Sequence, residues 1–330
     1  GAYWDTEVKR AQVMGLESFP VFTRKQSTDV SYIANAKKLL SMTDRIYPQF
    51  ATHNAHTMAA VLEMAHDKRV FEFQRLHGMG ERLHDIVLEQ EGTRCRIYAP
   101  VGAHRDLLAY LVRRLLENGA NSSFVNQIVD ETVRPEVVAA CPIAALEAMA
   151  VLESPVLATG PTLFGKRRNS KGWDLSDSAD LATIEAARVP FEETLFEARP
   201  MLAGPVAGGV RVVVTNPATG DVVGHVLPAS APDVETALAA ARPWDAAPAE
   251  RAAVLRRAAD LYEAEFGTIF ALLAREAGKT LSDAVGELRE AVDFLRYYAD
   301  QGEALSAPAR GLFACISPWN FPLAIFSGQI

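Results

Sequence analysis

Four residues of the stretch YAPVGAHRDLLAYLVRRLLE (98–117) have the types and spacing to bind a small carboxylate. Arg113, Arg114 and Glu117 follow Tyr110 by three, four and seven positions, so the four residues share one face of a helix. Two adjacent guanidinium groups repel each other on an open surface, but each presents a planar fork that holds a carboxylate by two bonds. The ordinary alternative is a solvated helix face with an Arg–Glu pair.

The elements around this helix follow the pattern of a parallel α/β layer over residues 1–128. We expect strands at 1–4, 45–52, 70–78 and 95–102, and helices at 28–41, 54–66, 79–89 and 104–118. Four strand and helix units fit half of an eight-unit barrel. A small doubly wound sheet fits them nearly as well.

Polar and aromatic residues gather at the carboxyl ends of the expected strands. They are Tyr3, Trp4, Thr52, His53, Gln74, His77 and Tyr98. This placement favours the barrel, because barrel enzymes build their sites at that face. Trp4 and Tyr98 are also compatible with a packed rim, and His53 and His56 with caps of the helix that follows. No metal site is expected, since no carboxylate or cysteine accompanies the histidines at ligand spacing.

The segment TRK (23–25) is a candidate anion site. It precedes a helix that we expect to open at Ser27, Thr28 and Asp29. The amino end of a helix presents free N–H groups and the positive end of its dipole, and an arginine and a lysine add full charges.

Composition limits the class of protein. Of 330 residues, 49% are hydrophobic and 22% are charged, which is ordinary for a soluble protein long enough for two domains. The formal net charge of −8 argues against a general nucleic-acid surface. Cys95, Cys141 and Cys315 are widely spaced without a CxxC pair, which indicates a reducing compartment and no structural zinc. No apolar stretch approaches the roughly 18 residues of a membrane span, and no signal peptide is evident. Because the chain begins at Gly1 and ends at Ile330 within an apolar segment, we expect a piece of a longer protein.

The second half of the chain changes character. Residues 129–204 contain several prolines and the polar run GKRRNSKGW (165–173), and we expect a helical or irregular linker there with a solvated KRR loop. From 205 a further domain begins. It has two β runs joined by a turn at Asn216, Pro217 and Gly220, and then helices at 232–241, 247–276 with a short break, and 280–300. An apolar strand at 312–316 is expected to end in Ser-Pro-Trp-Asn, at an edge where α/β proteins bind ligands.

Residues 1–128 resemble the second half of the proline dehydrogenase barrel. The matching motifs are GAYWDTEVKRAQ, PVFTRKQSTDVSYIANAKKLL, YPQFATHNAHT, FEFQRLHGMGE and CRIYAPVGAHRDLLAYLVRRLLENGANSSFVN. Residues from 205 resemble the N-terminal part of the aldehyde dehydrogenases through TNPATGDVVGHV, REAGKTLSDAVGELREAVDFLRYYA and ISPWNFPL. Their order in one chain resembles the bifunctional proline utilization A family. The expected fold is therefore α/β, with a partial (β/α)8 barrel of the last four strand–helix units followed by the start of an aldehyde dehydrogenase fold.

The resemblance implies FAD in the barrel and the oxidation of L-proline to 1-pyrroline-5-carboxylate, which hydrolyses to glutamate semialdehyde. Arg113 and Arg114 match the clamp for the proline carboxylate, and Glu117 matches the residue that orients them. The positions that wall the proline ring are Tyr98, Tyr110, Leu76 and Tyr3. The positions implied for FAD are Ala2, Trp4, Thr23, Arg24, Lys25, Thr52, His53, Asn54, Gln74 and Leu76, with Phe124 and Asn126 as weaker matches.

For the second half, the resemblance implies NAD-dependent oxidation of glutamate semialdehyde to L-glutamate. Ile316, Ser317, Pro318 and Trp319 match positions that line the NAD site, and Asn320 matches an oxyanion-hole donor. The family's glycine-rich NAD turn, catalytic cysteine and general-base glutamate have no match here, and we expect Cys315 in the core. The earlier barrel strands, with a lysine, an aspartate and an arginine of the family site, have no match either.

These departures predict that the chain alone cannot oxidise an aldehyde. A half barrel leaves unpaired strand edges and an open core, so we also expect weak solubility and poor FAD retention. The family implies a membrane quinone as electron acceptor, a homo-oligomer, and a cytoplasmic location with peripheral association at the inner face of the membrane. Nucleic acid is implied only for members that carry an N-terminal DNA-binding segment.

Two other classes of protein remain open from the residues. One is a flavin barrel of a single activity followed by an unrelated domain. The other is a scaffold without catalysis, in which the arginine pair forms a structural ion pair and the second domain mediates oligomerisation. Bound flavin that responds to proline would separate the enzyme from the scaffold.

Overall fold

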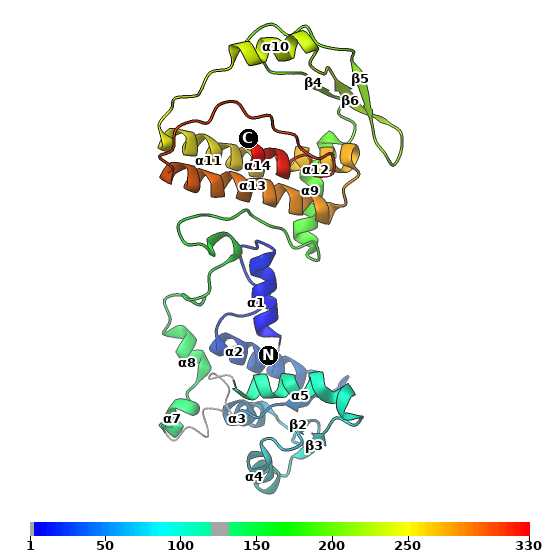
Figure 1. Ribbon diagram of the computed structural model, residues 1–330. Coiled ribbons are helices and arrows are strands. Elements are labelled where there is room, and N and C mark those ends of the chain that lie inside the picture. The colour runs from blue at the N-terminus through cyan, green and yellow to red at the C-terminus, as the bar shows by residue number, and fades with distance from the viewer. Residues whose placement is uncertain (1–2, 120–131) are drawn as a thin grey trace. The chain divides into compact units, whose positions relative to one another are not determined.

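The computed structural model describes residues 3–119 and 132–330, with the backbone alone for 115–119. The chain divides into two compact units (Figure 1). The first unit contains Gly1–Val8 and Phe19–Leu157, and the second contains Lys9–Ser18 and Ala158–Ile330. Helix α1 (Trp4–Val13) therefore contributes residues to both units.

The first unit is built on a parallel sheet of strands β1 (Gln49–Ala51), β2 (Glu72–Leu76) and β3 (Arg94–Tyr98), in that order. Parallel neighbours need a crossover connection, and helices α3 (Ala55–Met64) and α4 (Glu81–Glu91) provide it. The strands expected at 45–52, 70–78 and 95–102 and the helices that follow them are confirmed.

The two faces of this sheet differ in character. Phe50 and Phe73 lie in a core with Phe71, against helices α2 (Lys25–Leu40), α3 and α4. Side chains alternate along a strand, so Glu72, Gln74 and Leu76 point to the opposite face. Register places Tyr98 beside Leu76 on that face. The sheet thus has an aromatic face toward the helices and a mainly polar face away from them.

Among the described residues, the first unit contains three further helices. They are α5 (His104–Gly119), α7 (Pro135–Val138) and α8 (Pro142–Glu147), and α8 packs against α2. The strand expected at 1–4 is wrong for its described residues, because helix α1 begins at Trp4. Asp5 and Glu7 fill its first turn, where acidic side chains favour a helix. Helix α2 begins at Lys25, three residues before the start of the helix expected at 28–41.

The second unit contains a small mixed sheet of order β4-β6-β5. Strands β5 (Val212–Thr215) and β6 (Val222–Val226) form the expected hairpin, with Gly220 at φ 79° in the turn between them. Strand β4 (Phe196–Ala198) was not expected; it pairs parallel to β6 and comes from the segment assigned to the linker.

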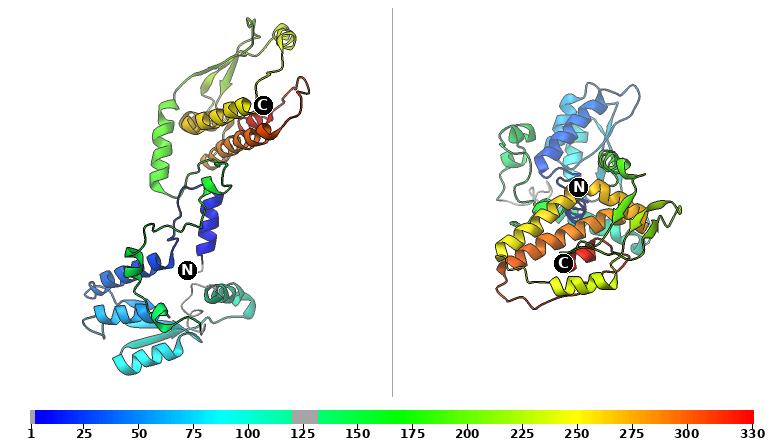
Figure 2. Two further views of the ribbon diagram at one scale, coloured as in Figure 1. Left: turned by 90° about the vertical axis from the view of Figure 1, so that its left-hand side faces the viewer. Right: turned by 90° about the horizontal axis from the view of Figure 1, so that it is seen from above.

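Helices form most of the second unit. They are α9 (Ser178–Arg188), α10 (Ala231–Ala240), α11 (Pro248–Ala264), α12 (Phe266–Ala277), α13 (Leu281–Ala304) and α14 (Ala324–Gln329), with short 3-10 turns η1 (Gly160–Thr162) and η2 (Val189–Phe191). The break expected within 247–276 falls at Glu265. Helices α11 and α13 lie side by side (Figure 2). Their core includes Phe270, Leu288 and Val292.

Three expectations for this unit need correction. The strand at 312–316 is absent from the described structure: this segment is extended chain with no strand paired to it, and a strand needs such a partner. For the same reason Cys315 is exposed and not a core residue. The polar run 165–173 is only partly solvated, since Ser170 and Trp173 are buried while the KRR residues are mostly exposed.

No helix of residues 3–119 and 132–330 combines the length and the apolar character that a bilayer span requires.

Candidate functional site

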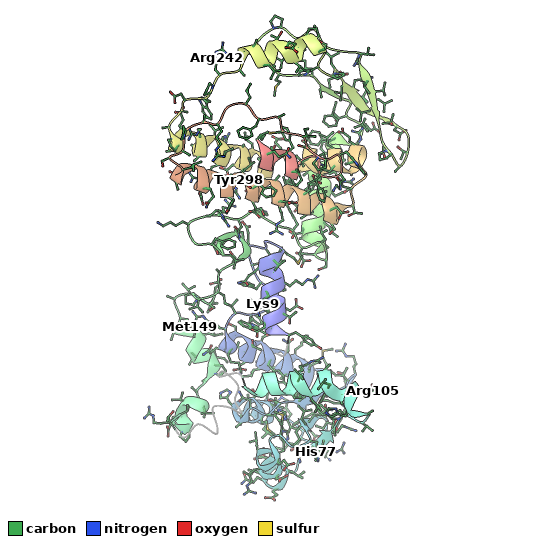
Figure 3. All side chains as sticks on the ribbon, in the orientation of Figure 1. Lys9, His77, Arg105, Met149, Arg242 and Tyr298 are labelled. Atoms are coloured by element: carbon green, nitrogen blue, oxygen red, sulfur yellow. The ribbon has the colours of Figure 1, made fainter. Side chains whose placement is uncertain are left out.

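The carboxyl end of the parallel sheet brings three expected site residues together. His53 follows β1, and its Nε2 accepts a hydrogen bond from the backbone N–H of Leu76 at 3.2 Å. Leu76 is paired with Tyr98 across β2 and β3, and the next N–H, from His77, donates to the carbonyl of Tyr98 at 3.0 Å. His77 lies just after β2 (Figure 3). His53, Leu76 and Tyr98 therefore lie at one edge, as the sequence predicted.

A second histidine supports this edge from within the core. His84 of α4 is buried, and its Nε2 lies 2.9 Å from the carbonyl oxygen of Thr52. A carbonyl only accepts, so this nitrogen carries the proton and donates. The other nitrogen lies 3.4 Å from Sγ of Cys95 on β3. Sequence reasoning missed His84; the available signal was its place three residues before Val87 on the apolar face of a helix.

His53 is held neutral at ordinary pH. Its pKa is lowered from 6.5 to about 4, mainly by burial and then, in decreasing order of size, by electrostatic repulsion from His84, Arg75 and Arg114. The contribution of Arg114, which belongs to helix α5, means that this helix lies near the edge of the sheet where His53 is found. A neutral His53 is consistent with Nε2 accepting from Leu76, because a protonated imidazole only donates.

This shift predicts acid sensitivity. The unfolded chain binds a proton at His53 below about pH 6.5, whereas the folded chain does so only near pH 4, so stability falls as the pH drops through this window. We expect a His53→Gln variant of the full-length protein to lose part of the decline in unfolding temperature between pH 7 and pH 4.5. A His77→Gln variant, at an exposed position on the same edge, should keep it. Equal pH profiles for both variants would contradict the assignment.

The arginine pair lies on helix α5 with two of the expected aromatic partners. The Arg113 guanidinium lies 4.5 Å from the centroid of the Tyr3 ring, and that of Arg114 lies 5.4 Å from the Tyr110 ring. The Tyr110 hydroxyl is buried and has no hydrogen-bond partner among the side chains that the structure describes. A buried hydroxyl normally has such a partner. The side chain of Glu117 lies outside the described residues.

The side chains of the TRK segment (23–25) contact other residues of the same chain. The hydroxyl oxygen of Thr23 accepts from the N–H of Ser154 at 2.8 Å, and Nε of Arg24 donates to the carbonyls of Leu152 and Glu153, each at 3.1 Å. Lys25 forms an ion pair with Asp29 one turn on. These contacts fix the amino end of α2, and no side chain caps it.

The other positions matched to FAD have local partners as well. Trp4 donates its indole N–H to the carbonyl of Phe22 at 2.8 Å. Asn54, not a histidine, caps α3 by accepting from the N–H of Thr57. Gln74 donates to Glu72 at 3.1 Å, and Glu72 forms a two-bond ion pair with Arg96 that lowers its pKa. Ala2, Phe124 and Asn126 lie outside the described residues.

The residues matched to NAD and the oxyanion hole lie between α13 and α14. Ser317 donates to Oε1 of Gln329 at 3.0 Å, and the Gln329 amide donates to the carbonyl of Ile316 at 3.2 Å. Ile316 and Trp319 are each 85% exposed. Pro318 and Asn320 form the following turn and are also largely exposed. Most of these residues are therefore exposed to solvent in the described structure.

Within the two described stretches, no three His, Cys, Asp or Glu side chains are grouped so that they could hold a metal ion.

Two family profiles match the chain, one in each half. The proline dehydrogenase family matches residues 1–127, and the aldehyde dehydrogenase family matches residues 206–330. Over its whole length the chain is 50% identical to the bifunctional protein PutA of Klebsiella aerogenes and 50% identical to that of Escherichia coli K12. It spans about a quarter of the length of these relatives, 27% in each case.

Solved structures give the same result. A crystal structure of a bifunctional proline utilization A protein superposes with a TM-score of 0.81 at 44% identity, covering all of this chain and 33% of the other. The protein from Bdellovibrio bacteriovorus, inactivated by N-propargylglycine, superposes with a TM-score of 0.82 at 31% identity, covering 99% of this chain and 36% of the other. The expected fold, a proline dehydrogenase part followed by the start of an aldehyde dehydrogenase, is confirmed.

Proposed function

Because the chain belongs to the family of bifunctional proline utilization A (PutA) proteins, we propose that it is part of an enzyme that oxidises L-proline to L-glutamate in two steps. One observation carries the proposal: the profiles of two oxidoreductase families follow each other in one chain that matches PutA from end to end. The first half contributes to proline dehydrogenase, and the second to glutamate semialdehyde dehydrogenase.

In the first reaction, Arg113 and Arg114 bind the carboxylate of proline. Proline is a zwitterion with an apolar ring, so it needs a paired cationic fork beside apolar walls. Tyr3 and Tyr110 already lie against the two guanidinium groups, and Leu76 and Tyr98 are paired on the adjacent sheet edge. Glu117 orients the arginine pair. These residues bind and orient the substrate and perform no covalent chemistry.

FAD, when bound, supplies the two-electron oxidation. The described residues fit a flavin at the carboxyl end of the sheet. His53 is neutral there, Gln74 lies on the polar face of the sheet, and Leu76 is buried beside them. Thr52 and Asn54 complete this edge, with Trp4, Thr23, Arg24 and Lys25 as the further positions matched to the cofactor.

In the second reaction, Asn320 donates a hydrogen bond to the oxygen of the aldehyde as negative charge develops on it. NAD, when bound, accepts the hydride, and residues 316–319 form part of its site. We propose that further residues complete this site, because Ile316 and Trp319 are each 85% exposed.

The finer partners follow from the family. We propose glutamate semialdehyde as the product that the two parts share, a membrane quinone as the electron acceptor of the flavin, and a homo-oligomer. The location is proposed as cytoplasmic, with peripheral association at the inner face of the membrane.

A flavin titration of the full-length protein that contains this chain tests the proposal. The yellow absorbance band should bleach when L-proline is added under anaerobic conditions, and the product should then support NAD reduction. A protein that stays colourless with FAD, or yellow and unchanged by proline, would favour the scaffold. Bleaching without NAD reduction would favour a flavin barrel with an unrelated second domain.

A further inference from the structure

Helix α14 begins directly behind the turn that carries Trp319 and Asn320. Its first N–H groups have no partner within the helix. The N–H of Leu323 donates to Oε1 of Glu287 at 2.9 Å, and that of Ala324 donates to the same oxygen at 3.3 Å. Glu287 belongs to α13 and is 3% exposed. A buried carboxylate therefore fixes the chain three residues after Asn320.

The other oxygen of Glu287 faces Lys279. The ammonium nitrogen lies 3.0 Å from Oε2, outside the direction of a hydrogen bond, so the contact is ionic. The same nitrogen lies 4.6 Å from the centroid of the Phe321 ring. Lys279 and Glu287 together contact the chain on both sides of Pro322, immediately after Asn320.

Lys279 has a fixed place of its own. Gly278, at φ 65°, ends α12 in the left-handed conformation, and the N–H of Lys279 then donates to the carbonyl of Leu273 at 3.0 Å. Thr280 begins α13 by accepting from the N–H of Asp283. The Gly-Lys-Thr sequence therefore ends one helix, places the ammonium and begins the next.

A buried carboxylate is tolerated only when it is paired and hydrogen-bonded. Displacement of the turn would remove the two N–H donors from Glu287 and the aromatic face from Lys279. The turn is thus held in place by Glu287 and Lys279, because both charged groups would lose partners if the turn moved.

We propose that Glu287 and Lys279 are positioning residues that hold Asn320 where it stabilises the oxyanion during aldehyde oxidation. The inference rests on the proposed function. It assigns no contact with substrate to either residue, since both act through the backbone and ring that flank Asn320. Positioning groups matter because a misplacement of about 1 Å costs roughly 100-fold in rate.

The test is a double-mutant cycle in the full-length enzyme, measured by NAD-dependent oxidation of glutamate semialdehyde. We expect Asn320→Ala to lower kcat by about 100-fold or more. Glu287→Ala should lower kcat by about 10- to 100-fold with little change in KM, because ground-state binding does not use the oxyanion contact. The double variant should resemble Asn320→Ala alone, since both substitutions remove one function.

Three further variants separate positioning from folding. Glu290→Gln changes an exposed glutamate one turn along the same helix and should behave as the wild type. If Glu287→Ala does not fold, Glu287→Gln and Lys279→Met take its place. The first keeps an oxygen acceptor for the N–H groups, and the second removes the ammonium from both Glu287 and the Phe321 ring. Far-UV circular dichroism and the unfolding temperature of each variant report whether the second unit, which contains these residues, is folded.

Two results would overturn the positioning role alone. One is a loss of kcat in the double variant equal to the product of the two single losses. The other is a wild-type kcat in folded Glu287 and Lys279 variants. A wild-type enzyme that oxidises no aldehyde would overturn the proposed function, and the positioning role with it.

Discussion

Replacing Arg113 and Arg114 together by methionine in the full-length enzyme is expected to raise the Michaelis constant for L-proline by at least about 100-fold. A hydrogen bond to a charged group contributes about 1.5–3 kcal/mol, so the loss of one arginine weakens binding about 10- to 150-fold and the loss of both weakens it further. Methionine keeps an unbranched apolar stem against Tyr3 and Tyr110, so the change removes charge more than packing.

Steady-state kinetics and the flavin absorbance of each purified variant measure this effect. The FAD content should stay close to that of the wild type, because neither arginine is among the positions matched to the cofactor. Arg105→Met is the matched control: Arg105 lies in the first turn of the same helix, and its side chain is 89% exposed (Figure 3). An unchanged Michaelis constant in the double variant, or an equal rise in the control, would exclude the carboxylate clamp.

The parts of this site that the sequence could predict depend on local pattern. The spacing of Arg113 and Arg114 on α5 and the alternation that puts Gln74 and Leu76 on one face of β2 are properties of single elements. The hairpin around Gly220 follows from its turn residues in the same way. Parallel pairing then brings the ends of β2 and β3 together without further information.

The parts that escaped prediction depend on partners distant in sequence. Nothing near Thr23 and Arg24 indicates that residues 152–154 bind them. The support that His84 gives to Thr52 spans 32 residues, and the support that Glu287 gives to Leu323 spans 36. The strand expected at 312–316 had the right composition but has no paired strand in the described structure, because local propensity alone does not make a sheet.

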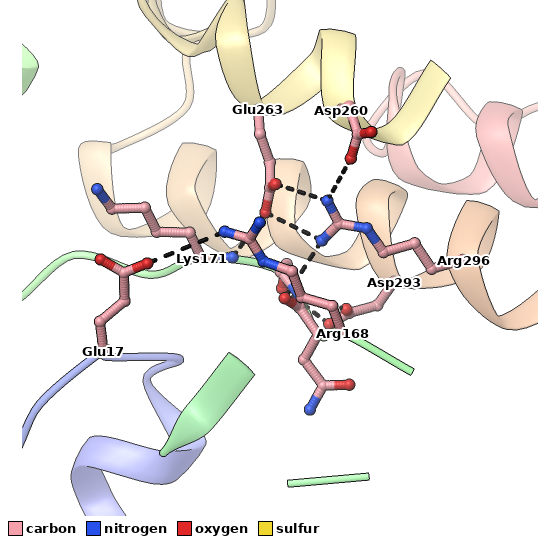
Figure 4. A network of polar contacts seen from close by, with 9 residues as sticks. Glu17, Arg168, Lys171, Asp260, Glu263, Asp293 and Arg296 are labelled. Carbon is pink, nitrogen blue, oxygen red and sulfur yellow. Dashed lines mark hydrogen bonds and ion pairs between the residues drawn. The ribbon is translucent and has the colours of Figure 1, made fainter. Parts of the chain in front are cut away.

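Residues 169–173 are a further example, and they take part in a charge network of the second unit (Figure 4). Arg296 of α13 donates to Glu263 and Asp260 of α11 and to the carbonyl of Asn169. Glu263 also accepts from the N–H of Lys171 at 2.7 Å. One arginine therefore ties two helices to a loop whose composition predicted solvent exposure.

Arg296→Met is expected to destabilise this unit by about 3–5 kcal/mol. The carboxylate of Glu263 is largely buried, and the substitution removes the cation that is paired with it. Arg256→Met is the matched control. Arg256 also joins α11 to α13 through two carboxylates, Asp300 and Glu303, but its side chain is 42% exposed whereas that of Arg296 is 6% exposed. Solvent screens such a surface pair, so its loss should cost about 0–1 kcal/mol.

Hydrogen exchange of peptides from α11 and α13, measured in the full-length enzyme, gives the free energy of local opening for both variants. Faster exchange in Arg296→Met alone would establish that burial, and not the number of ion pairs, decides the contribution of these arginines. Equal exchange in the two variants would mean that water reaches Glu263 as readily as it reaches Glu303. The network would then hold the 169–173 loop without stabilising the helices.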